Sequence, residues 1–352
     1  MCTPPFRKFH EFDNLKAMSA QTPLHPPVTQ QYPTMNCCRA CWRGLHDLSS
    51  VSLLGGRRET TWTSKEYEEY EQEFQKYMQQ NLQNQTPAED FATEQWDESE
   101  VLQGKLSQLQ KLCQDANHMV VFTGAGISTA TGLPDYRGPR GVWTRKLKGE
   151  TVSDDLELKR SLQPSSAHMA IARLYCSGLI KFVATTNVDD LHCKSGLPKE
   201  SLAELHGNSF VEECEKCLKQ YKQSFVTRTA TGLFEHHTGR YCECGGPLRD
   251  IIVNFGNTFE HVPSMEDQHD AAWVHCLKAD LVLVLGSSLS VPTACDLPEI
   301  CLEARDGKPD GGKLVIVNLQ RTPKDAMASL RIFASCDDVM EFLEQTFLPK
   351  AQ

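Results

Sequence analysis

The chain has 352 residues, of which 40% are hydrophobic, and a formal net charge of −10. This length can supply one large hydrophobic core or two modest ones, while the negative charge argues against non-specific binding to nucleic acid or anionic membranes. The sequence shows neither an apolar run of about 18 residues nor a signal-peptide core. We therefore expect no membrane association, and we expect the 15 cysteines to be thiols or metal ligands in a reducing compartment.

The N-terminal part of the chain divides into two segments. Residues 1–62 are rich in Pro, Gln, Ser and Thr and are expected to be largely disordered. Residues 63–98 are acidic and are expected to be helical. An aromatic stripe with helical spacing lies in this second segment, at Tyr67, Tyr70, Phe74 and Tyr77. The stripe predicts a helix that docks on the main domain or on a partner.

The main domain is expected over residues 99–350, where short apolar runs alternate with helical patterns. Helices are predicted from Ser99 onward, at Ser165–Cys176 and at Asp337–Phe347. The predicted strands are the apolar runs Met119–Phe122, Phe182–Thr185, Ile251–Val253, Leu281–Leu285 and Leu314–Val317. Continuous apolar strands between helices predict an α/β fold with a doubly wound, parallel, Rossmann-like sheet.

The first predicted strand leads into TGAGISTATGLPDYRG, residues 123–138. Gly124 and Gly126 stand where a parallel strand would turn into a helix, so the backbone could approach a pyrophosphate there. Ser128 and Thr129 would add hydroxyl donors. The segment departs from the G-x-G-x-x-G fingerprint, and no acid closes a second strand about 20 residues later. The pattern favours a nucleotide site over an ordinary dehydrogenase, with a ligand-free turn as the alternative.

Two cysteine pairs lie in the second half of the main domain, at Cys214, Cys217, Cys242 and Cys244. Four thiolates on tight turns can surround a zinc ion tetrahedrally, and four protein ligands leave no open position for catalysis. We therefore predict a structural zinc in a small inserted domain at about residues 207–250. Only one residue separates the second pair, so His236 or His237 remains an alternative ligand.

Polar residues follow the second predicted strand and precede the cysteine pairs. Asn187 and Asp189, taken by themselves, are typical of capping residues, and an isolated His206 is typical of a core or surface histidine. These segments and the glycine loop nevertheless converge on one edge, because the carboxyl ends of parallel strands meet there. An imidazole beside a bound dinucleotide suits general-base catalysis near neutral pH.

In chain order, GAGIS, PDYRG, TNVDDLH, LHGN, the paired cysteines, GSSL and VNLQ resemble the motifs of the sirtuins, the NAD-dependent protein lysine deacylases. The resemblance covers about residues 99–348. RGPRGVWT and IVNLQRTPKD are most similar to the sirtuin-6 and sirtuin-7 branch, and CDDVM leans toward sirtuin-7. The resemblance implies NAD as a co-substrate and one structural zinc.

The resemblance also implies roles for individual residues. The acyl oxygen of a substrate lysine attacks the nicotinamide ribose and displaces nicotinamide, and His206 then acts as general base on a ribose hydroxyl. Asn187 and Asp189 hold the ribose and the carboxamide, while residues 253–256 pair with the substrate peptide as an added strand. The implied NAD-binding residues are Gly124, Ala125, Gly126, Ser128, Thr129, Asp135, Tyr136, Arg137, Trp143, Thr186, Asn187, Val188, Asp189, Gly286, Ser287, Ser288, Asn318, Leu319, Gln320 and Cys336.

Three positions depart from the family pattern. Thr186 replaces the glutamine of TQN, Asp190 replaces the glycine of D-G-L-H, and Asn257 replaces a glutamate. The first two are expected at the reacting ribose, where they would slow turnover or weaken NAD binding, and the third is expected in the peptide groove. The first two leave one alternative to a deacylase, an NAD or ADP-ribose sensor with little turnover. A separate alternative is a protein mono-ADP-ribosyltransferase, which would use the same cleavage of NAD with another nucleophile.

The expected function is NAD-dependent transfer of an acyl group from a protein lysine to ADP-ribose, with release of nicotinamide. Histone tails or other nuclear proteins are the expected substrates, and chromatin association and a nuclear location follow from the same resemblance. The sequence leaves open the acyl group, a cytoplasmic pool and the oligomeric state.

Overall fold

The computed structural model describes residues 93–147, 150, 161–229, 235–254, 257, 262–291, 294–304 and 309–348. All of them belong to the compact unit Asn81–Gln352. The extension at 1–62 and the aromatic stripe at 67–77 lie outside the described residues. Residues 94–98, which end the predicted acidic segment, are not helical. In the described part of the chain, the helices are too short or too polar to cross a bilayer.

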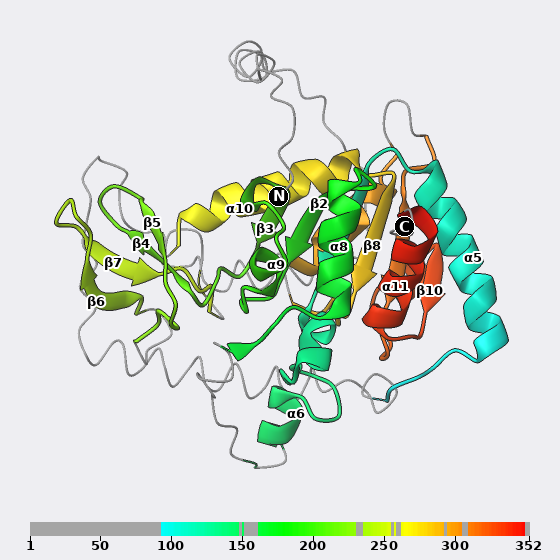
Figure 1. The fold of residues 1–352 in the computed structure, drawn as a ribbon, viewed down its shortest axis with the longest axis horizontal. Coiled ribbons are helices and arrows are strands. Elements are labelled where there is room, and N and C mark those ends of the chain that lie inside the picture. The colour runs from blue at the N-terminus through cyan, green and yellow to red at the C-terminus, as the bar shows by residue number, and fades with distance from the viewer. Residues whose placement is uncertain are drawn as a thin grey trace, which may run out of the picture. The chain divides into compact units, whose positions relative to one another are not determined.

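A parallel sheet forms the centre of the fold, with the strand order β10-β9-β8-β1-β2-β3 (Figure 1). Its strands are β1 (Met119–Thr123), β2 (Ile180–Thr185), β3 (Leu202–Glu204), β8 (Leu281–Leu285), β9 (Lys313–Val317) and β10 (Leu330–Ile332). Two sets of three strands run outward from the β1–β8 pair, which is the Rossmann order. The sheet's topological switch point therefore lies between β1 and β8.

Helices cover both faces of this sheet, as the doubly wound prediction requires. One face packs against α5 (Ser99–Asp115), α8 (Ser166–Cys176) and α11 (Cys336–Phe347). The other face packs against α10 (Ser264–Lys278) and the 3₁₀ segment η3 (Ala294–Leu302). Both faces are apolar because every β1 and β8 side chain is buried.

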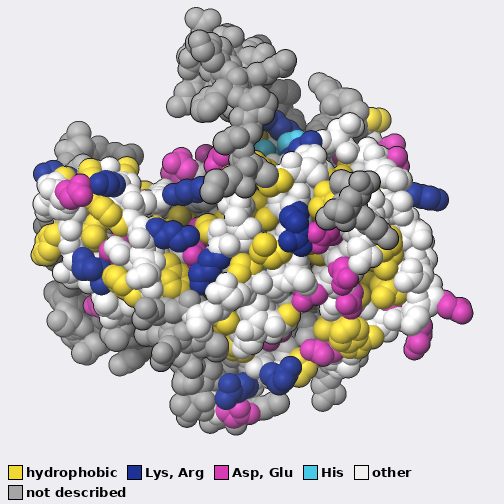
Figure 2. All heavy atoms as spheres, in the orientation of Figure 1, with side chains coloured by type: hydrophobic (Ala, Val, Ile, Leu, Met, Phe, Trp, Pro, Cys, Tyr) yellow, Lys and Arg dark blue, Asp and Glu magenta, His cyan; other side chains and the backbone are white. Residues whose placement is uncertain are grey.

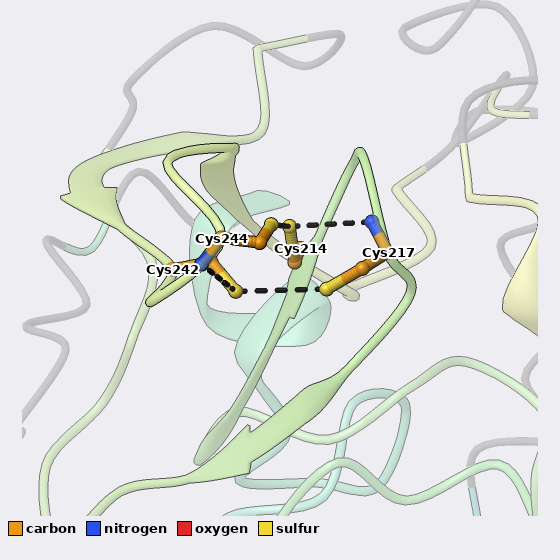
Figure 3. Close-up of side chains that lie close together, drawn as sticks. All are labelled: Cys214, Cys217, Cys242 and Cys244. Atoms are coloured by element: carbon orange, nitrogen blue, oxygen red, sulfur yellow. Dashed lines mark hydrogen bonds between the residues drawn. The ribbon is translucent and has the colours of Figure 1, made fainter.

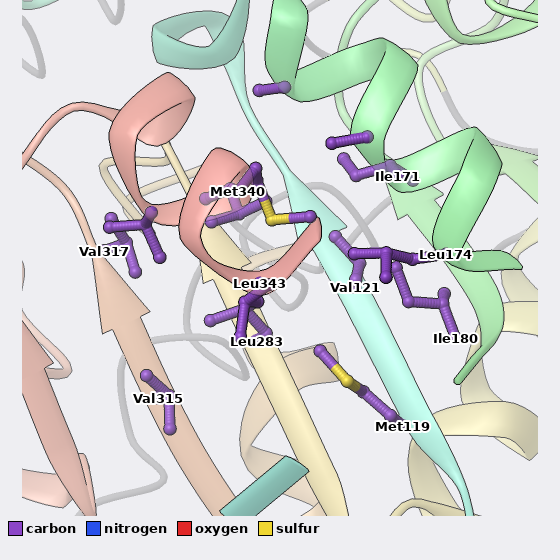
Figure 4. Packing of buried hydrophobic residues seen from close by; sticks show 14 of the residues in the cluster. Met119, Val121, Ile171, Leu174, Ile180, Leu283, Val315, Val317, Met340 and Leu343 are labelled. Atoms are coloured by element: carbon purple, nitrogen blue, oxygen red, sulfur yellow. The ribbon is translucent and has the colours of Figure 1, made fainter. Parts of the chain in front are cut away.

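Figure 4 shows the core between the sheet and the first set of helices. Val121 of β1 and Leu283 of β8 lie in one cluster with Ile171 of α8 and with Met340 and Leu343 of α11. Each of these five side chains has no exposed surface. The carboxyl ends of the strands are therefore held on a rigid, apolar base.

Local sequence explains where these helices begin and end. Ser165 caps α8 by accepting a hydrogen bond from the His168 backbone N–H, and the His168 ring accepts one from the Ser165 N–H in return. Gly178, which has φ of 82°, follows that helix and prevents it from continuing. Shorter helical segments complete the domain: η1 (Ala125–Thr131), α6 (Val142–Leu147), α9 (Leu191–Lys194), η2 (Lys199–Ser201) and η4 (Asp325–Met327).

A second, antiparallel sheet with the strand order β5-β4-β7-β6 is inserted between β3 and α10. Its strands are β4 (Val211–Cys214), β5 (Gln220–Lys222), β6 (His237–Tyr241) and β7 (Pro247–Asp250). It forms a separate small body beside the parallel sheet (Figure 1). Basic and acidic side chains are interspersed on the face drawn in Figure 2, so its described part is not a uniformly basic surface.

One prediction of local structure was wrong. Ile251–Val253 is not a strand of the parallel sheet, and the third strand is β3, which is too short and too mixed in composition to stand out in the sequence. The helix predicted at the glycine loop is present as the 3₁₀ helix η1, which is capped by Gly132 with φ of 97°. β10 and α10 were not predicted from the sequence.

Truncation of Leu109 tests whether α5 is an integral part of this domain. Leu109 is fully buried against the sheet, so Leu109→Ala should lower the free energy of unfolding by about 2–5 kcal/mol. Val101 lies on the same helix and is 49% exposed, so Val101→Ala should change it by less than about 1 kcal/mol. Urea unfolding of both variants measures the difference, and equal effects would contradict the packing described.

Candidate functional site

The loops that follow β1 and β8 touch each other at the switch point. A Cβ atom on Gly124 would lie 2.7 Å from Ser287 Cα, and one on Gly126 would lie 2.7 Å from Gly286 Cα. The Gly126 N–H donates to the Gly286 carbonyl at 2.8 Å. The glycines are therefore required by this contact between two backbones, a reason that the sequence analysis did not foresee.

Three predicted site residues meet beside this contact. The Asn187 amide donates to the Gly124 carbonyl at 3.1 Å and to the Ser128 hydroxyl at 3.3 Å. The Ser128 hydroxyl donates to an Asp189 carboxylate oxygen at 2.7 Å, and the other oxygen accepts the Leu191 N–H at 3.0 Å. The loops after β1 and β2 are thus joined by side chains of the residue types predicted there.

His206 lies after β3 at the same edge of the sheet. Its Nδ1 lies 3.2 Å from the Thr186 carbonyl, which can only accept, so Nδ1 carries the proton and Nε2 has the lone pair. Burial, helped by the nearby His269 and Arg137 and opposed by the bond to Thr186, lowers the pKa of His206 to about 4. The imidazole is therefore neutral at pH 7 and presents a proton acceptor.

A buried chain of hydrogen bonds supports the loop after β2. The Thr185 hydroxyl accepts the Asn187 N–H at 3.1 Å and the Thr123 hydroxyl at 2.7 Å. Thr123 has then used its only proton, so His192 Nε2 donates to it at 2.8 Å. The His192 and His168 ring centres lie 4.7 Å apart. The periodicity of the sequence did not predict this network of contacts, because its members come from β1, β2, α8 and α9.

The residues predicted for the adenosine half lie after β8 and β9. The Ser287 hydroxyl accepts the Leu289 N–H at 3.2 Å, and Ser288 bonds the Ser290 hydroxyl at 2.8 Å. The Asn318 amide donates to the Gln320 carbonyl at 2.9 Å. Cys336 is the first residue of α11, and burial raises the pKa of its thiol to about 12, so the thiol is neutral.

Two residues that sequence reasoning missed brace the loop after β9. The Arg331 guanidinium donates to the carbonyls of Asn318 and Gln320. The Gln95 N–H donates to the Leu319 carbonyl at 2.8 Å. Gln95 precedes the region of family resemblance, and Arg331 lies in a strand that was not predicted, so neither was identified.

The charge of Arg137, in the predicted cofactor loop at 135–137, contributes to the lowered pKa of His206. This loop therefore lies near that histidine. The Asp135 carboxylate accepts the Gly138 N–H at 3.1 Å, and the Tyr136 side chain is 43% exposed. Trp143 lies in α6, and its side chain is outside the described residues.

All three departures from the family pattern have defined contacts, and Asp190 bonds Asn208 and Lys222. The Thr186 hydroxyl donates to the Thr123 carbonyl at 3.3 Å. The Asn257 side-chain oxygen accepts the Asn254 N–H at 2.7 Å, which closes a turn. Phe255 and Gly256 of the predicted peptide strand lie outside the described residues.

The four predicted metal ligands come together on two turns of the antiparallel sheet (Figure 3). Their sulfur atoms lie within 4.8 Å of one another. The Cys214 sulfur accepts backbone N–H groups at 3.4 and 3.5 Å, and a Cβ atom on Gly246 would lie 2.7 Å from it. His236 instead bonds Asp250 at 3.1 Å, and His237 is exposed beside Glu215. The donor set therefore fits one structural zinc held by four thiolates.

Cys242→Ser should reduce the zinc content from one ion per chain to well below that, because three thiolates and a hydroxyl form a poorer site. Cys176→Ser is the matched control, since Cys176 is an exposed thiol at the end of α8. Elemental analysis of both purified variants checks this prediction. Full zinc in the Cys242 variant would contradict the four-thiolate site.

The buried histidines predict a loss of stability in acid. Burial lowers the pKa values of His168 and His192 to about 3. The unfolded chain takes up these protons below pH 6.5 and the folded chain does not, so stability should fall as the pH drops below 6.5, by up to about 1.4 kcal/mol per pH unit for each histidine.

His168→Gln should therefore reduce the slope of unfolding free energy against pH by nearly one proton between pH 5.5 and 6.0, whereas His237→Gln, at an exposed position, should not. Denaturant titrations at several pH values measure both slopes, and any acid-induced zinc loss is common to the two variants. Identical slopes would show that His168 protonates in the folded protein.

Comparison with known proteins adds independent information. A match to the Sir2 family covers residues 151–293. The NAD-dependent protein deacetylase SRT1 of Arabidopsis thaliana is 45% identical over 249 residues, which are 70% of this chain and 50% of the relative. The NAD-dependent protein deacetylase sirtuin-7 of Homo sapiens is 43% identical over 253 residues, 70% of this chain and 61% of the relative. The chain thus spans about half to three-fifths of these relatives.

Shorter relatives are covered more fully. The NAD-dependent protein deacetylase Sirt6 of Drosophila melanogaster is 37% identical over 258 residues, 71% of this chain and 77% of the relative. A solved structure of Sir2 with a deacetylated p53 peptide and 3′-O-acetyl-ADP-ribose is 30% identical, with a TM-score of 0.53 over 69% of this chain and 98% of the other. The order of the strands and the inserted cysteine module are consistent with these similarities. The chain belongs to the Sir2 family, the sirtuins.

Proposed function

We propose that this protein is an NAD-dependent protein-lysine deacylase. The observation that carries the proposal is the state of His206. Its Nδ1 is bonded to the Thr186 carbonyl and its ring is neutral at pH 7, at the sheet edge where Asn187 and Asp189 meet the glycine loop. The relatives named as NAD-dependent protein deacetylases support the same activity.

The polar groups at the carboxyl ends of four adjacent strands fit an extended dinucleotide. Ser128, Asn187, Ser287 and Asn318 follow β1, β2, β8 and β9, and each is at most 7% exposed. Buried hydroxyls and amides at a switch point are suited to binding phosphate and ribose groups. We assign the pyrophosphate to the loop from Gly124 to Thr129 and the adenosine to the loops after β8 and β9.

When bound, NAD supplies a ribose carbon whose bond to nicotinamide can be broken. We assign Asn187 and Asp189 to the nicotinamide ribose and carboxamide, and Tyr136 with Arg137 to the loop that shields them. His206 Nε2 accepts the proton of a ribose hydroxyl. Its lowered pKa keeps this base unprotonated at neutral pH but also makes it a weaker base.

The substrate we propose is an acylated lysine in a protein. The Val253 N–H donates to the His206 carbonyl at 3.0 Å, so the segment proposed to bind the peptide runs directly beside the proposed base. A solved Sir2 structure is described as bound to acetylated peptide. We further propose that the substrates include histone tails and that the protein associates with chromatin in the nucleus. The sirtuin-7-like motifs support this proposal.

His206→Ala should abolish peptide-dependent release of nicotinamide while leaving NAD affinity within a few-fold. Removal of a general base typically lowers the rate by about 10²–10⁴-fold. His237→Ala, at an exposed position of β6, is the control and should retain full activity. The assay uses purified protein with acetyl- and long-chain-acyl-lysine histone peptides, and isothermal titration calorimetry measures NAD binding.

The alternatives give different results in the same assay. Tight NAD or ADP-ribose binding with no nicotinamide release would identify a sensor. Nicotinamide release with labelled ADP-ribose attached to protein would identify a mono-ADP-ribosyltransferase. Deacylation that persists in His206→Ala would refute the assigned role of the base.

A further inference from the structure

Asp190 has an unusual backbone and environment. Its φ of 67° lies in the left-handed region, where residues other than glycine are uncommon, and its side chain is 3% exposed. Aspartate tolerates this conformation better than most residues, but it keeps a cost. A buried carboxylate in a strained backbone persists only if its neighbours hold it.

Polar neighbours surround this carboxylate. Asn208 Nδ2 donates to Asp190 Oδ1 at 2.9 Å and to a Glu204 carboxyl oxygen at 2.7 Å. The Lys222 ammonium lies 2.9 Å from the same Asp190 oxygen. The Cys193 thiol also hydrogen-bonds Asp190, and burial raises the pKa of that thiol to about 12, so it is neutral.

Asp190 and two of these neighbours, Asn208 and Lys222, belong to three separate parts of the fold. Asp190 ends the loop that carries Asn187 and Asp189, Asn208 follows His206 by two residues, and Lys222 ends β5 of the zinc module. A second link runs parallel to the first, because the Ser209 N–H donates to the Val188 carbonyl at 2.9 Å. The carboxylate therefore joins the two catalytic loops to the small sheet.

The cluster could be mistaken for a second metal site. Ligand atoms of Asp190, Cys193 and Glu204 lie within 4.8 Å of one another. The Lys222 ammonium already supplies a cation at hydrogen-bonding distance from the Asp190 carboxylate. Asn208 donates a hydrogen bond to Asp190 and another to Glu204. The positive charge that this cluster needs comes from the chain itself.

We propose that Asp190 is a positioning residue, which fixes His206 relative to Asn187 and Asp189, and that Lys222 of the zinc module supplies its counter-charge. The Lys222 side chain is 53% exposed, so the ion pair itself stabilises the fold only weakly. Removal of Lys222 nevertheless leaves a buried carboxylate without its cation, and the two loops must then rearrange. The zinc module thereby takes a direct part in placing the base.

The kinetic part of the test rests on the proposed deacylase function. Asp190→Gly removes the carboxylate and relieves the backbone, because glycine adopts a φ of 67° without strain. Lys222→Met keeps the aliphatic stem and removes the charge. Lys219→Met is the matched control, since Lys219 pairs with Glu243 in an exposed ion pair on the same module.

Asp190→Gly restores the glycine of the family pattern, which from the sequence alone was expected to speed turnover. Because Asp190 joins Asn208 and Lys222 in this chain, Asp190→Gly and Lys222→Met should instead each lower kcat for peptide-dependent nicotinamide release by about tenfold, with NAD affinity within threefold and one zinc per chain. The double variant should lose no more than about twofold beyond the poorer single variant, because both changes break one interaction. Lys219→Met should match the unmodified protein. In ¹⁵N-histidine NMR spectra, the His206 signals, assigned by their loss in His206→Ala, should shift in Asp190→Gly and Lys222→Met only.

Several outcomes would overturn the positioning role: unchanged kcat with unshifted His206 signals in both variants, losses that multiply in the double variant, or equal losses in Lys219→Met. If the unmodified protein releases no nicotinamide, the deacylase proposal fails, and the His206 signals then decide the positioning role by themselves. If Lys222→Met loses zinc or does not fold, Asp190→Gly supplies the same comparison.

Discussion

Gly126 donates its backbone N–H to the Gly286 carbonyl across the two central strands of the sheet, and neither loop has space for a Cβ atom at this contact. Because the contact lies at the switch point, it brings the loops after β1 and β8 together at the carboxyl edge of the sheet. Asn187 then ties the loop after β2 to the same place through the Gly124 carbonyl. The arrangement of the whole site follows from this close approach of two backbones.

Burial sets the chemistry of the histidines at this edge. His168, His192 and His206 all have pKa values far below the ordinary range because a charged imidazole would lose its hydration there. His192 bonds Thr123 in the hydrogen-bonded chain that supports the loop after β2, and His168 lies against the His192 ring, while Nε2 of His206 keeps its lone pair. Burial of the histidines therefore serves both the support of the loop after β2 and the proposed catalysis, but it lowers the stability of the fold in acid.

The sequence predicted those parts of the structure that depend on local pattern. Apolar runs located β1, β2, β8 and β9, the helical pattern at Ser165–Cys176 located α8, and cysteine spacing located the four thiols. It did not predict β3, because three residues carry too little pattern, nor the bracing by Arg331 and Gln95, which depends on tertiary contacts. Asp190 was noticed only as a departure, and its partner Lys222 lies 32 positions along the chain in a different sheet.

The measurement that tests the account most directly is a product balance by mass spectrometry. Purified full-length protein with zinc bound is incubated with NAD and an acetyl-lysine histone peptide. The account predicts deacetylated peptide, nicotinamide and O-acetyl-ADP-ribose in equal amounts, because the acetyl group moves to the sugar for each nicotinamide released. Free acetate without nicotinamide, or ADP-ribose attached to protein with the peptide still acetylated, would contradict it.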